Sequence, residues 1–569
     1  METLTCLTVL ILGTILVAAV ALKTLLSFLD ISFWTLTLQS RVLVGLIAGL
    51  FAILFTIVIP IVIVVSVMNL SITFPTLVIT AIPFILVAFG ICFFVIVFFE
   101  SEEEEMSEYR IESDSMGTMQ VPSESYYGAQ TQRAVLNFPI SSLRFPRSFI
   151  RAMGLIKKAA AEVNSELGLL DKGIADSIVK AADEVIEGKL DDQFVVDIFQ
   201  TGSGTSTNMN TNEVIANRAI EIQGGEIGSR DVHPNDHVNM SQSSNDVIPT
   251  AIHISALQEI EDRLIPSLQK LHDSLQARAQ DFDAVIKIGR THLQDAVPIR
   301  LGQEFAAYAS MIEHAMTRMK LVFPHLSELA IGGTAVGTGL NCPPEFSPSM
   351  VSKISKWTNI EFQEASDKFE AIASRDAAVE ASGMLKTVAC SLMKIANDLR
   401  WLGSGPRCGI GEIILPSTQP GSSIMPGKVN PVIPEAITMI VAQVIGNDIT
   451  ISVGGQSGNF EINVMKPVIA YNLLQSIDLI SNGCLVLAEK CVDGLKADSD
   501  RCQEMVEQSL AMVTSLAPKV GYDKAAQIAK EAYQTGRTVR EVARDSQVME
   551  EQELEKVLDP QSMTKGGIV

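Results

Sequence analysis

Apolar residues follow two patterns along this chain, with continuous runs in residues 1–99 and helical periodicity farther on. Three runs without a charged residue cover Leu4–Leu22, Val42–Val67 and Phe74–Phe99. Each run is long enough to cross the hydrocarbon core of a bilayer as a helix. The pattern therefore predicts about three transmembrane helices within residues 1–99.

The flanking charges suggest how this segment is oriented. The first run has the length of a signal-peptide core, but Glu2 stands where basic residues would be expected and two more runs follow, so we favour a membrane helix. Lys23 and Arg41 flank the first connection, and the positive-inside rule then places everything after Phe99 in the cytoplasm. We therefore expect a cytoplasmic catalytic domain with membrane association through residues 1–99.

An acidic run, Glu100–Glu105, follows the apolar segment and is typical of a solvated linker. From Met106 onward the chain resembles the N-terminus of a complete soluble enzyme. Residues 1–105 are therefore either a genuine anchor or the product of fused or misassigned reading frames. Fractionation of the native protein without detergent separates these two interpretations.

Farther along, apolar residues recur every three or four positions, which is the period of an amphipathic helix. Four segments show it: Leu257, Ile260, Leu264, Leu268, Leu271 and Leu275; Leu385, Val388, Leu392, Ile395 and Leu399; Ile437, Ile440, Val441, Val444 and Ile445; and the more hydrophobic Val468–Leu487. Long helices with little strand signal between them predict a mainly α protein built around an antiparallel bundle. After about Leu495, short helices with Lys and Glu faces predict a small helical domain.

The charge and cysteine content narrow the classes of ligand. With 43 Lys and Arg against 65 Asp and Glu, the formal charge is -22, which argues against a nucleic-acid surface because phosphate binding needs clustered basic residues. An anionic substrate must then be held by local groups. The eight cysteines include no Cys-x-x-Cys pair, so no zinc or iron–sulfur site is indicated and we expect buried, reduced thiols. The glycine-rich Gly332–Gly337 follows a helical pattern, so it does not indicate a dinucleotide site.

Three polar clusters stand at the ends of predicted helices. The first joins Thr201–Glu213 to Ser243–Asn245, the second is Gly289–Asp295, and the third is the loop Gly421–Pro431 with Glu435 behind it. The loop holds two glycines, two prolines, adjacent hydroxyls and a lysine, so it cannot continue a helix. Its hydroxyls, N–H groups and cation suit closure over an anion. Helix capping explains only part of the first cluster, so we expect a binding surface there.

These clusters match the three conserved regions of the fumarase/aspartase superfamily, and residues 106–569 resemble a class II, iron-free fumarase. His292 and the pair Ser243-Ser244 match fumarases, whereas aspartases carry Gln and Ser-Thr at these positions. The resemblance implies three mostly helical domains around a long central bundle, and a homotetramer in which each active site takes one region from each of three subunits. The expected domains are an N-terminal lyase domain at 106–245, a central bundle at 246–497 and a C-terminal helical domain at 498–569, preceded by the hydrophobic segment and linker at 1–105.

The implied reaction is reversible hydration of fumarate to (S)-malate, by anti addition of water through a carbanion-like intermediate. The resemblance assigns Ser422 as a base acting as an alkoxide, His292 as the general acid that helps hydroxide leave, and Glu435 as the partner that holds the His292 ring. Because proton abstraction builds a second negative charge onto a carboxylate, donors must be concentrated around it. The residues assigned to the substrate are Ser203, Gly204, Thr205, Ser243, Ser244, Asn245, Thr291, Ser423, Lys428, Val429 and Asn430. No metal and no cofactor is implied.

A further set, His233, Pro234, Asn235 and Asp236, resembles the secondary dicarboxylate site of fumarases. Met240 stands where a lysine is expected, a departure that concerns the electrostatics of that site and not the chemistry. Two alternatives remain. One is an aspartate ammonia-lyase, which a comparison of malate with aspartate turnover would identify; the other is a catalytically silent, membrane-tethered structural homologue, which predicts lost site residues.

Overall fold

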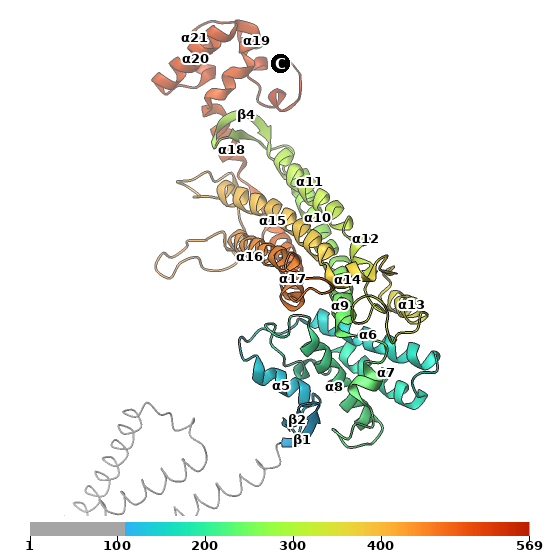
Figure 1. Ribbon diagram of the computed structural model, residues 1–569. Coiled ribbons are helices and arrows are strands. Elements are labelled where there is room, and N and C mark those ends of the chain that lie inside the picture. Colours follow the sequence, from blue (N-terminus) through green and yellow to red (C-terminus); the bar gives the residue numbers. More distant parts are fainter. Residues whose placement is uncertain (1–108, 568–569) are drawn as a thin grey trace, which may run out of the picture. The chain divides into compact units, whose positions relative to one another are not determined.

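The computed structural model describes residues 109–567, which are mainly helical with a few short strand pairs (Figure 1). The expectation of a mainly α fold is confirmed. The predicted transmembrane helices and the acidic linker lie outside the described residues.

The first part of the described chain carries short strands and four helices. These are β1 (Tyr109–Asp114), β2 (Gly117–Pro122), α5 (Ala129–Asn137), α6 (Arg147–Glu166), α7 (Lys172–Glu187) and α8 (Thr205–Ile222), with a 3-10 turn at Asp191–Gln193 and a π turn at Pro234–Val238. Local signals set the helix ends. Asp171 caps α7 by accepting from Gly173 N at 2.8 Å and Ile174 N at 3.1 Å. The helix ends at Gly188, whose φ of 83° suits a residue without a Cβ atom.

The central part is a bundle of long helices joined by short elements. These are α9 (Ser244–Glu259), a π turn (Ile260–Leu264), α10 (Ile265–Asp281), β3 (Ile286–Thr291), β4 (Gln294–Arg300), α11 (Leu301–Lys320), α12 (Phe323–Leu326), β5 (Glu328–Leu329), α13 (Phe346–Thr358), β6 (Gln363–Glu364), α14 (Lys368–Ala373), α15 (Asp376–Leu402), β7 (Ile413–Ile414), α16 (Val432–Gly455) and α17 (Lys466–Lys490). Helices α10 and α17 pack together, as do α15 and α16. The helical stretch from Ser244 to Asp281 is continuous, so at 1.5 Å per residue it spans roughly 55 Å.

The predicted apolar seams lie inside this bundle. The apolar residues predicted to form the first two seams, from Leu257 to Leu275 and from Leu385 to Leu399, are each at most 1% exposed. These two predictions are confirmed. In the third seam Ile437, Val441 and Val444 are buried, whereas Ile440 and Ile445 are only partly covered. The third seam therefore lies at the edge of the core that one chain can form.

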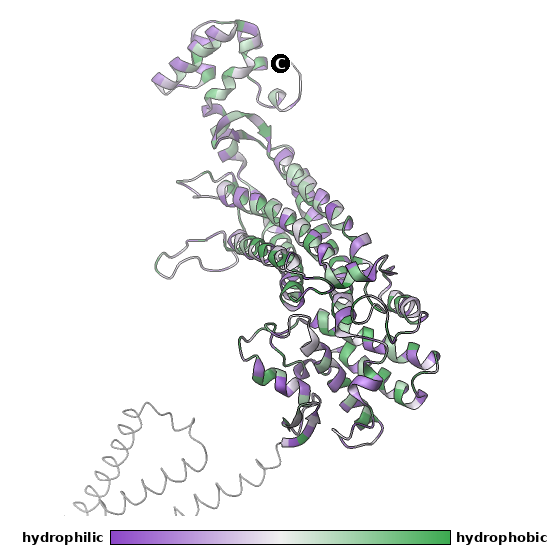
Figure 2. Cartoon of the chain, viewed as in Figure 1, coloured by the Kyte–Doolittle hydropathy of each residue, from purple (hydrophilic) through white to green (hydrophobic). Residues whose placement is uncertain are grey.

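Helix α16 is largely apolar in composition (Figure 2), and part of its surface is exposed. Of the described residues, only this helix has the length and apolar content of a membrane span, a test that core helices of soluble proteins also meet. Its inner face carries Asp448, whose carboxylate accepts from Lys386 Nζ at 2.6 Å. Met439, Ile449 and Val453 remain 67%, 61% and 46% exposed. An apolar helix face left uncovered beside a packed bundle is typical of an interface.

Strand pairs are the elements that the hydrophobic pattern did not predict. β3 and β4 form an antiparallel hairpin in which Thr291 pairs with Gln294. The cluster Gly289–Asp295, expected at a helix end, therefore lies at a hairpin tip. The alternation of Ile286 and Ile288 with polar or small residues is the period-two signal that was missed.

The last part of the chain has the expected short helices and a small core. Its elements are a 3-10 turn (Val492–Gly494), β8 (Lys496–Ala497), which pairs with β7, then α18 (Ser499–Gln508), a 3-10 turn (Leu510–Ser515), α19 (Ala517–Val520), α20 (Tyr522–Thr535), α21 (Val539–Asp545), α22 (Glu551–Val557) and a 3-10 turn (Ser562–Thr564). Ile288 of β3 packs into this core.

The prediction of buried thiols holds for Cys484, Cys491 and Cys502. It is wrong for Cys390 and Cys408, which are exposed. A cysteine has no polar signal of its own that distinguishes the inner from the outer face of a helix, so the sequence did not separate the two groups.

Candidate active site

Three predicted hydroxyl groups meet at the N-termini of α8 and α9. Thr205 Oγ1 lies 2.8 Å from Ser203 Oγ and 2.7 Å from Ser244 Oγ. Gly204, between them, has a φ of 83°, and a Cβ atom there would lie 2.8 Å from the Ile248 side chain. Glycine is therefore required to bring the two helix ends this close. Helix N-termini with adjacent hydroxyls offer several donors to an anion.

Asp246 fixes the start of α9 beneath these hydroxyls. Its fully buried carboxylate accepts from the backbone N–H groups of Ser243, Gly332 and Thr334, each at 2.9 Å. Burial raises the pKa of Asp246 to about 6, against the effect of these bonds. The glycine-rich Gly332–Gly337 therefore supports the cap of helix α9.

Asn245 is held from both sides by neighbouring segments. Its side chain donates to Ala335 O at 2.8 Å, and its carbonyl accepts from Lys466 Nζ at 3.0 Å. Burial lowers the pKa of Lys466 to about 6. The hydroxyl cluster, defined as Ser203, Thr205, Ser243, Ser244 and Asn245, is thus a rigid group formed within one chain.

Other polar residues of the same predicted cluster lie in the interior. The ammonium of Lys157, on α6, donates to Asn208 Oδ1 at 2.8 Å and to Asn239 Oδ1 and Gln242 Oε1 at 3.0 Å. Glu213 accepts from three backbone N–H groups in the first turn of α5 and just before it. Asn208 and Glu213 therefore bind other parts of the chain in the interior. The binding surface that was expected over Thr201–Glu213 is confined to the first residues of this segment.

The β3–β4 hairpin presents His292 at its tip. His292 and Leu293 form the two-residue turn, with φ of 54° and 60°, as in a type I′ turn. Neither residue is the glycine or asparagine that such positions favour, so each is strained by roughly 1–2 kcal/mol. Both are exposed, and the ring of His292 makes no hydrogen bond to any described residue. The predicted general acid, His292, therefore lies in a turn with a strained backbone.

The predicted base, Ser422, lies in an exposed loop before α16. Its Oγ accepts from Ile424 N at 3.2 Å and from Met425 N at 3.0 Å. The loop is closed by Gly421 N donating to Lys428 O at 2.8 Å and by Asn430 Nδ2 donating to Gly421 O at 2.6 Å. Two backbone N–H groups aimed at one serine oxygen stabilise negative charge on it.

Within one chain these three parts do not meet. The hydroxyl cluster is at the start of the α9–α10 rod, and the hairpin follows its far end (Figure 1). Glu435, in the first turn of α16, forms no ion pair with His292 in the described structure. The residues Thr291, Ser423, Lys428 and Val429 are all exposed, on the hairpin or on the loop. No single chain can therefore enclose a small substrate with all of them.

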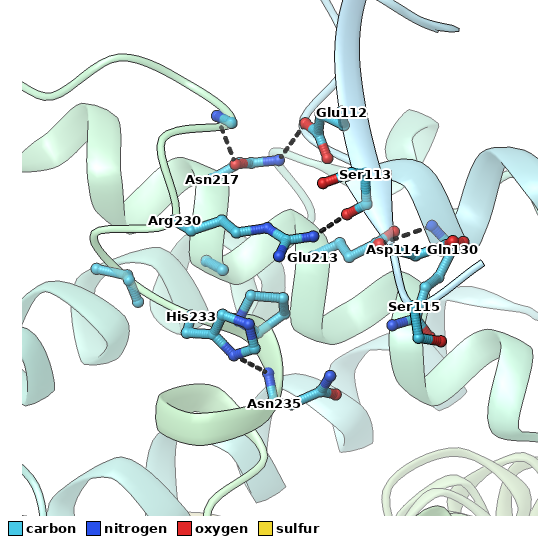
Figure 3. Close-up of a pocket in the computed structure, with 14 residues that line it drawn as sticks. Glu112, Ser113, Asp114, Ser115, Gln130, Glu213, Asn217, Arg230, His233 and Asn235 are labelled. Carbon is cyan, nitrogen blue, oxygen red and sulfur yellow. Dashed lines mark hydrogen bonds between the residues drawn. The ribbon is translucent and has the colours of Figure 1, made fainter. Parts of the chain in front are cut away.

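A separate cavity of about 320 Å³ lies beside the predicted secondary site (Figure 3). His233, Pro234 and Asn235 line it, whereas Asp236 does not. The structure adds Arg230, which the sequence did not single out; its guanidinium donates to Ser113 O. Its position three residues before His233 was the only available signal.

The carboxylates of this cavity already have partners. Glu112 accepts from Arg110 Nε at 2.8 Å and Asp114 from Arg133 Nε at 2.9 Å. His233 Nδ1 accepts from the N–H groups of the following turn, which leaves Nε2 as the proton-bearing atom. Arg230 is therefore the cation of the cavity without a carboxylate partner among the described residues.

Comparison with known proteins adds the family. A model described as "Lyase" matches residues 117–446, and one described as "Fumarase C C-terminus" matches residues 512–565. The class II fumarate hydratase of Halobacterium salinarum is 56% identical, over 82% of this chain and 99% of its own. The mitochondrial fumarate hydratase of Homo sapiens is 53% identical, over 80% of this chain and 90% of its own. A crystal structure of class II fumarase from Schistosoma mansoni superposes with a TM-score of 0.78 at 40% identity, over 80% of this chain and 99% of its own.

Proposed function

The chain belongs to the class II fumarate hydratases of the fumarase/aspartase superfamily; it is a hydro-lyase acting on fumarate, and we propose that Ser422, His292 and Glu435 carry its chemistry. The observation on which this proposal rests is the pair of N–H groups that donate to Ser422 Oγ. A free serine hydroxyl is far too weakly acidic to remove a proton from carbon, so its ionised form must be stabilised before it can act as a base.

The substrate has two carboxylates, and the chain offers two sets of groups for them. The hydroxyl cluster at the α8 and α9 N-termini gathers donors within hydrogen-bond distance of one another and suits one carboxylate. Lys428 forms no ion pair among the described residues and is exposed on the loop, so it suits the other. Bringing a cation to the carboxylate next to the reacting carbon offsets the charge that builds up there.

Proton transfer at the other carbon is assigned to His292. An imidazole can donate a proton to the departing hydroxide and take one up again during turnover. Glu435 is proposed to hold the ring from a different subunit, since within one chain the two groups form no ion pair.

We further propose a homotetramer in which each active site is built by three subunits. Two observations support it: the separation of hydroxyl cluster, hairpin and loop within one chain, and the uncovered apolar face of α16 formed by Met439, Ile449 and Val453. Burying that face against other copies would bring the exposed catalytic segments of neighbouring chains together. We also propose that the N-terminal lyase domain ends at residue 245 and the central bundle at residue 497.

The test of the activity is spectrophotometric measurement of fumarate formed from malate, with aspartate as the competing substrate. Turnover of malate and none of aspartate is expected, because His292 stands where aspartases carry Gln. Efficient release of ammonia from aspartate would instead favour the aspartate ammonia-lyase alternative.

The shared site has its own test. Ser422→Ala and His292→Asn subunits, each inactive alone, are unfolded, mixed in equal amounts and refolded together. Half of the hairpins and half of the loops are then intact, so about one quarter of the sites contain both and about one quarter of the parent activity returns. If each site were built within one chain, mixing would restore nothing.

Two further proposals concern the rest of the chain. We propose a secondary dicarboxylate site in the cavity lined by His233, Pro234, Asn235 and Arg230, together with the adjacent Asp236. Calorimetric titration with malate tests it by comparing the double variant Ser422→Ala, Arg230→Met with Ser422→Ala alone. Membrane association through residues 1–99 and a cytoplasmic catalytic domain stay predictions.

A further inference from the structure

A buried charge cluster joins the catalytic hairpin to the segment that precedes the catalytic loop. Glu412, which is 0% exposed, lies between α15 and β7. Its Oε2 accepts from Arg290 Nη1 at 2.9 Å and lies 3.2 Å from Lys287 Nζ. Both cations belong to β3, the strand that carries Thr291 and leads into His292.

The backbone of Glu412 is fixed independently of its side chain. Its N–H donates to Leu402 O at 2.9 Å, and its carbonyl accepts from Asp498 N at 2.9 Å. The next residues, Ile413 and Ile414, pair with β8. The carboxylate is therefore held at a set position by α15, α18 and a strand pair, and it can act as a fixed point for the hairpin.

The hairpin itself has few other constraints near its tip. The pairing register shifts between Ile288 and Arg290, and beyond the shift only two pairs, Arg290 with Asp295 and Thr291 with Gln294, join the strands to each other before the turn. Arg290 also donates to Met505 Sδ at 3.3 Å, but a thioether is a weak acceptor. The bond to Glu412 is thus the charge-assisted contact that ties this end of the strand to a segment outside the hairpin.

We propose that Glu412 is a positioning residue for the reaction: it sets the direction of the hairpin tip by holding Arg290, and thereby places His292. This inference rests on the proposed role of His292. It assigns to Glu412 no contact with substrate. The carboxylate acts through the strand, because removing it would leave Arg290 and the strained turn without their fixed point.

The first test is Glu412→Gln, which keeps the shape of the side chain and removes its charge. Lys287 also lies 3.2 Å from Glu304, so the variant does not leave that buried ammonium wholly unpaired, and we expect it to fold. The matched control is Asp448→Asn, which removes another buried carboxylate paired with a lysine, on α16. We expect Glu412→Gln to lower kcat by about tenfold or more with KM changed less than about threefold, and Asp448→Asn to leave kcat within about twofold at equal subunit assembly. Unchanged kcat in Glu412→Gln, or equal losses in both variants, would overturn the proposal.

The second test asks whether Glu412 acts on the hairpin of its own chain. In a mixture of Ser422→Ala and His292→Asn subunits, each active site takes its intact hairpin from a Ser422→Ala subunit and its intact loop from a His292→Asn subunit. Adding Glu412→Gln to the Ser422→Ala chain should reduce the restored activity about tenfold, whereas adding it to the His292→Asn chain should leave most of it. Equal reductions in the two arrangements would mean a general effect on folding and refute the positioning role.

These tests also separate this inference from the proposed function. If the parent mixture restores no activity, the shared site is wrong, and the kcat of Glu412→Gln homotetramers still decides the role of Glu412. In an Arg290→Met background, Glu412→Gln should add no further loss of kcat, because its effect passes through Arg290. A full additional loss there would contradict that route.

Discussion

The buried lysine beneath the hydroxyl cluster makes stability depend on pH in an unusual direction. Lys157 is 0% exposed and its ammonium is held by three amide oxygens, with no carboxylate within ion-pair distance among the described residues. Burial lowers the pKa of this lysine from 10.5 to about 7. The unfolded chain keeps the proton up to about pH 10.5, so above pH 7 the unfolded state binds more protons than the folded one. Stability is then expected to rise with pH.

The size of the effect follows from the same difference. Each pH unit between the two pKa values contributes at most about 1.4 kcal/mol, so raising the pH from 7 to 8.5 adds up to about 2 kcal/mol. Lys466, whose pKa burial lowers to about 6, contributes in the same direction. Asp246 acts in the opposite sense, but only below its raised pKa of about 6, outside this range. The contribution of Lys157 is therefore isolated by comparison with Lys157→Met.

The assay is thermal unfolding followed by the helical circular dichroism signal between pH 7 and 9, at one fixed subunit concentration. The parent should gain stability across this range, and Lys157→Met should lose up to about half of that slope, because Lys466 still contributes the rest. The matched control is Lys158→Met, because Lys158 is the next residue on α6 but pairs with Asp183 at 2.7 Å and lies over the Trp357 ring. Equal slopes in the parent and Lys157→Met, or a parent that loses stability as the pH rises, would refute the reasoning.

Three further outcomes are expected. Ser422→Ala should lower kcat by about a hundredfold or more while the circular dichroism spectrum is unchanged; near-normal turnover would remove Ser422 as the base. Glu213→Gln should lower the free energy of unfolding by about 2 kcal/mol, because the NH2 group of the glutamine would face a backbone N–H donor from which the carboxylate accepts. The control Asp176→Asn, at an exposed position, should leave the free energy of unfolding unchanged. Treatment with a chelator should leave turnover unchanged, because the family resemblance implies no metal, and a loss that added divalent ions restore would contradict this.

The long helices were predictable because their apolar residues recur with the period of the helix. The seam from Leu257 to Leu275 is an example: one helical stripe of this length is enough to identify both the element and its buried face. The hairpin was not predicted, since β3 is short and its turn is made of His292 and Leu293 instead of the Asn-Gly type of pair that marks a hairpin.

The sequence allowed candidate site residues to be named, but it did not predict their layout. The motif residues could be named from their resemblance to known fumarases, yet nothing in the order of the chain says that Ser244 and His292 lie at opposite ends of a rod. Lys157, Arg230 and Glu412 were missed for a different reason. Each depends on partners distant in the sequence, and a charged residue in a buried network has no local pattern that distinguishes it from one in solvent.

If each site takes its loop and its hairpin from different subunits, as proposed, the separation of these segments within a single chain has a genetic consequence. A cell that makes two versions of this protein, one damaged in the loop and one damaged in the hairpin, would assemble some working sites from two defective gene products. Conversely, a damaged subunit that still assembles would impair sites that its normal neighbours also help to build. The harm done by an allele would then depend on which segment it alters and on the allele with which it is inherited.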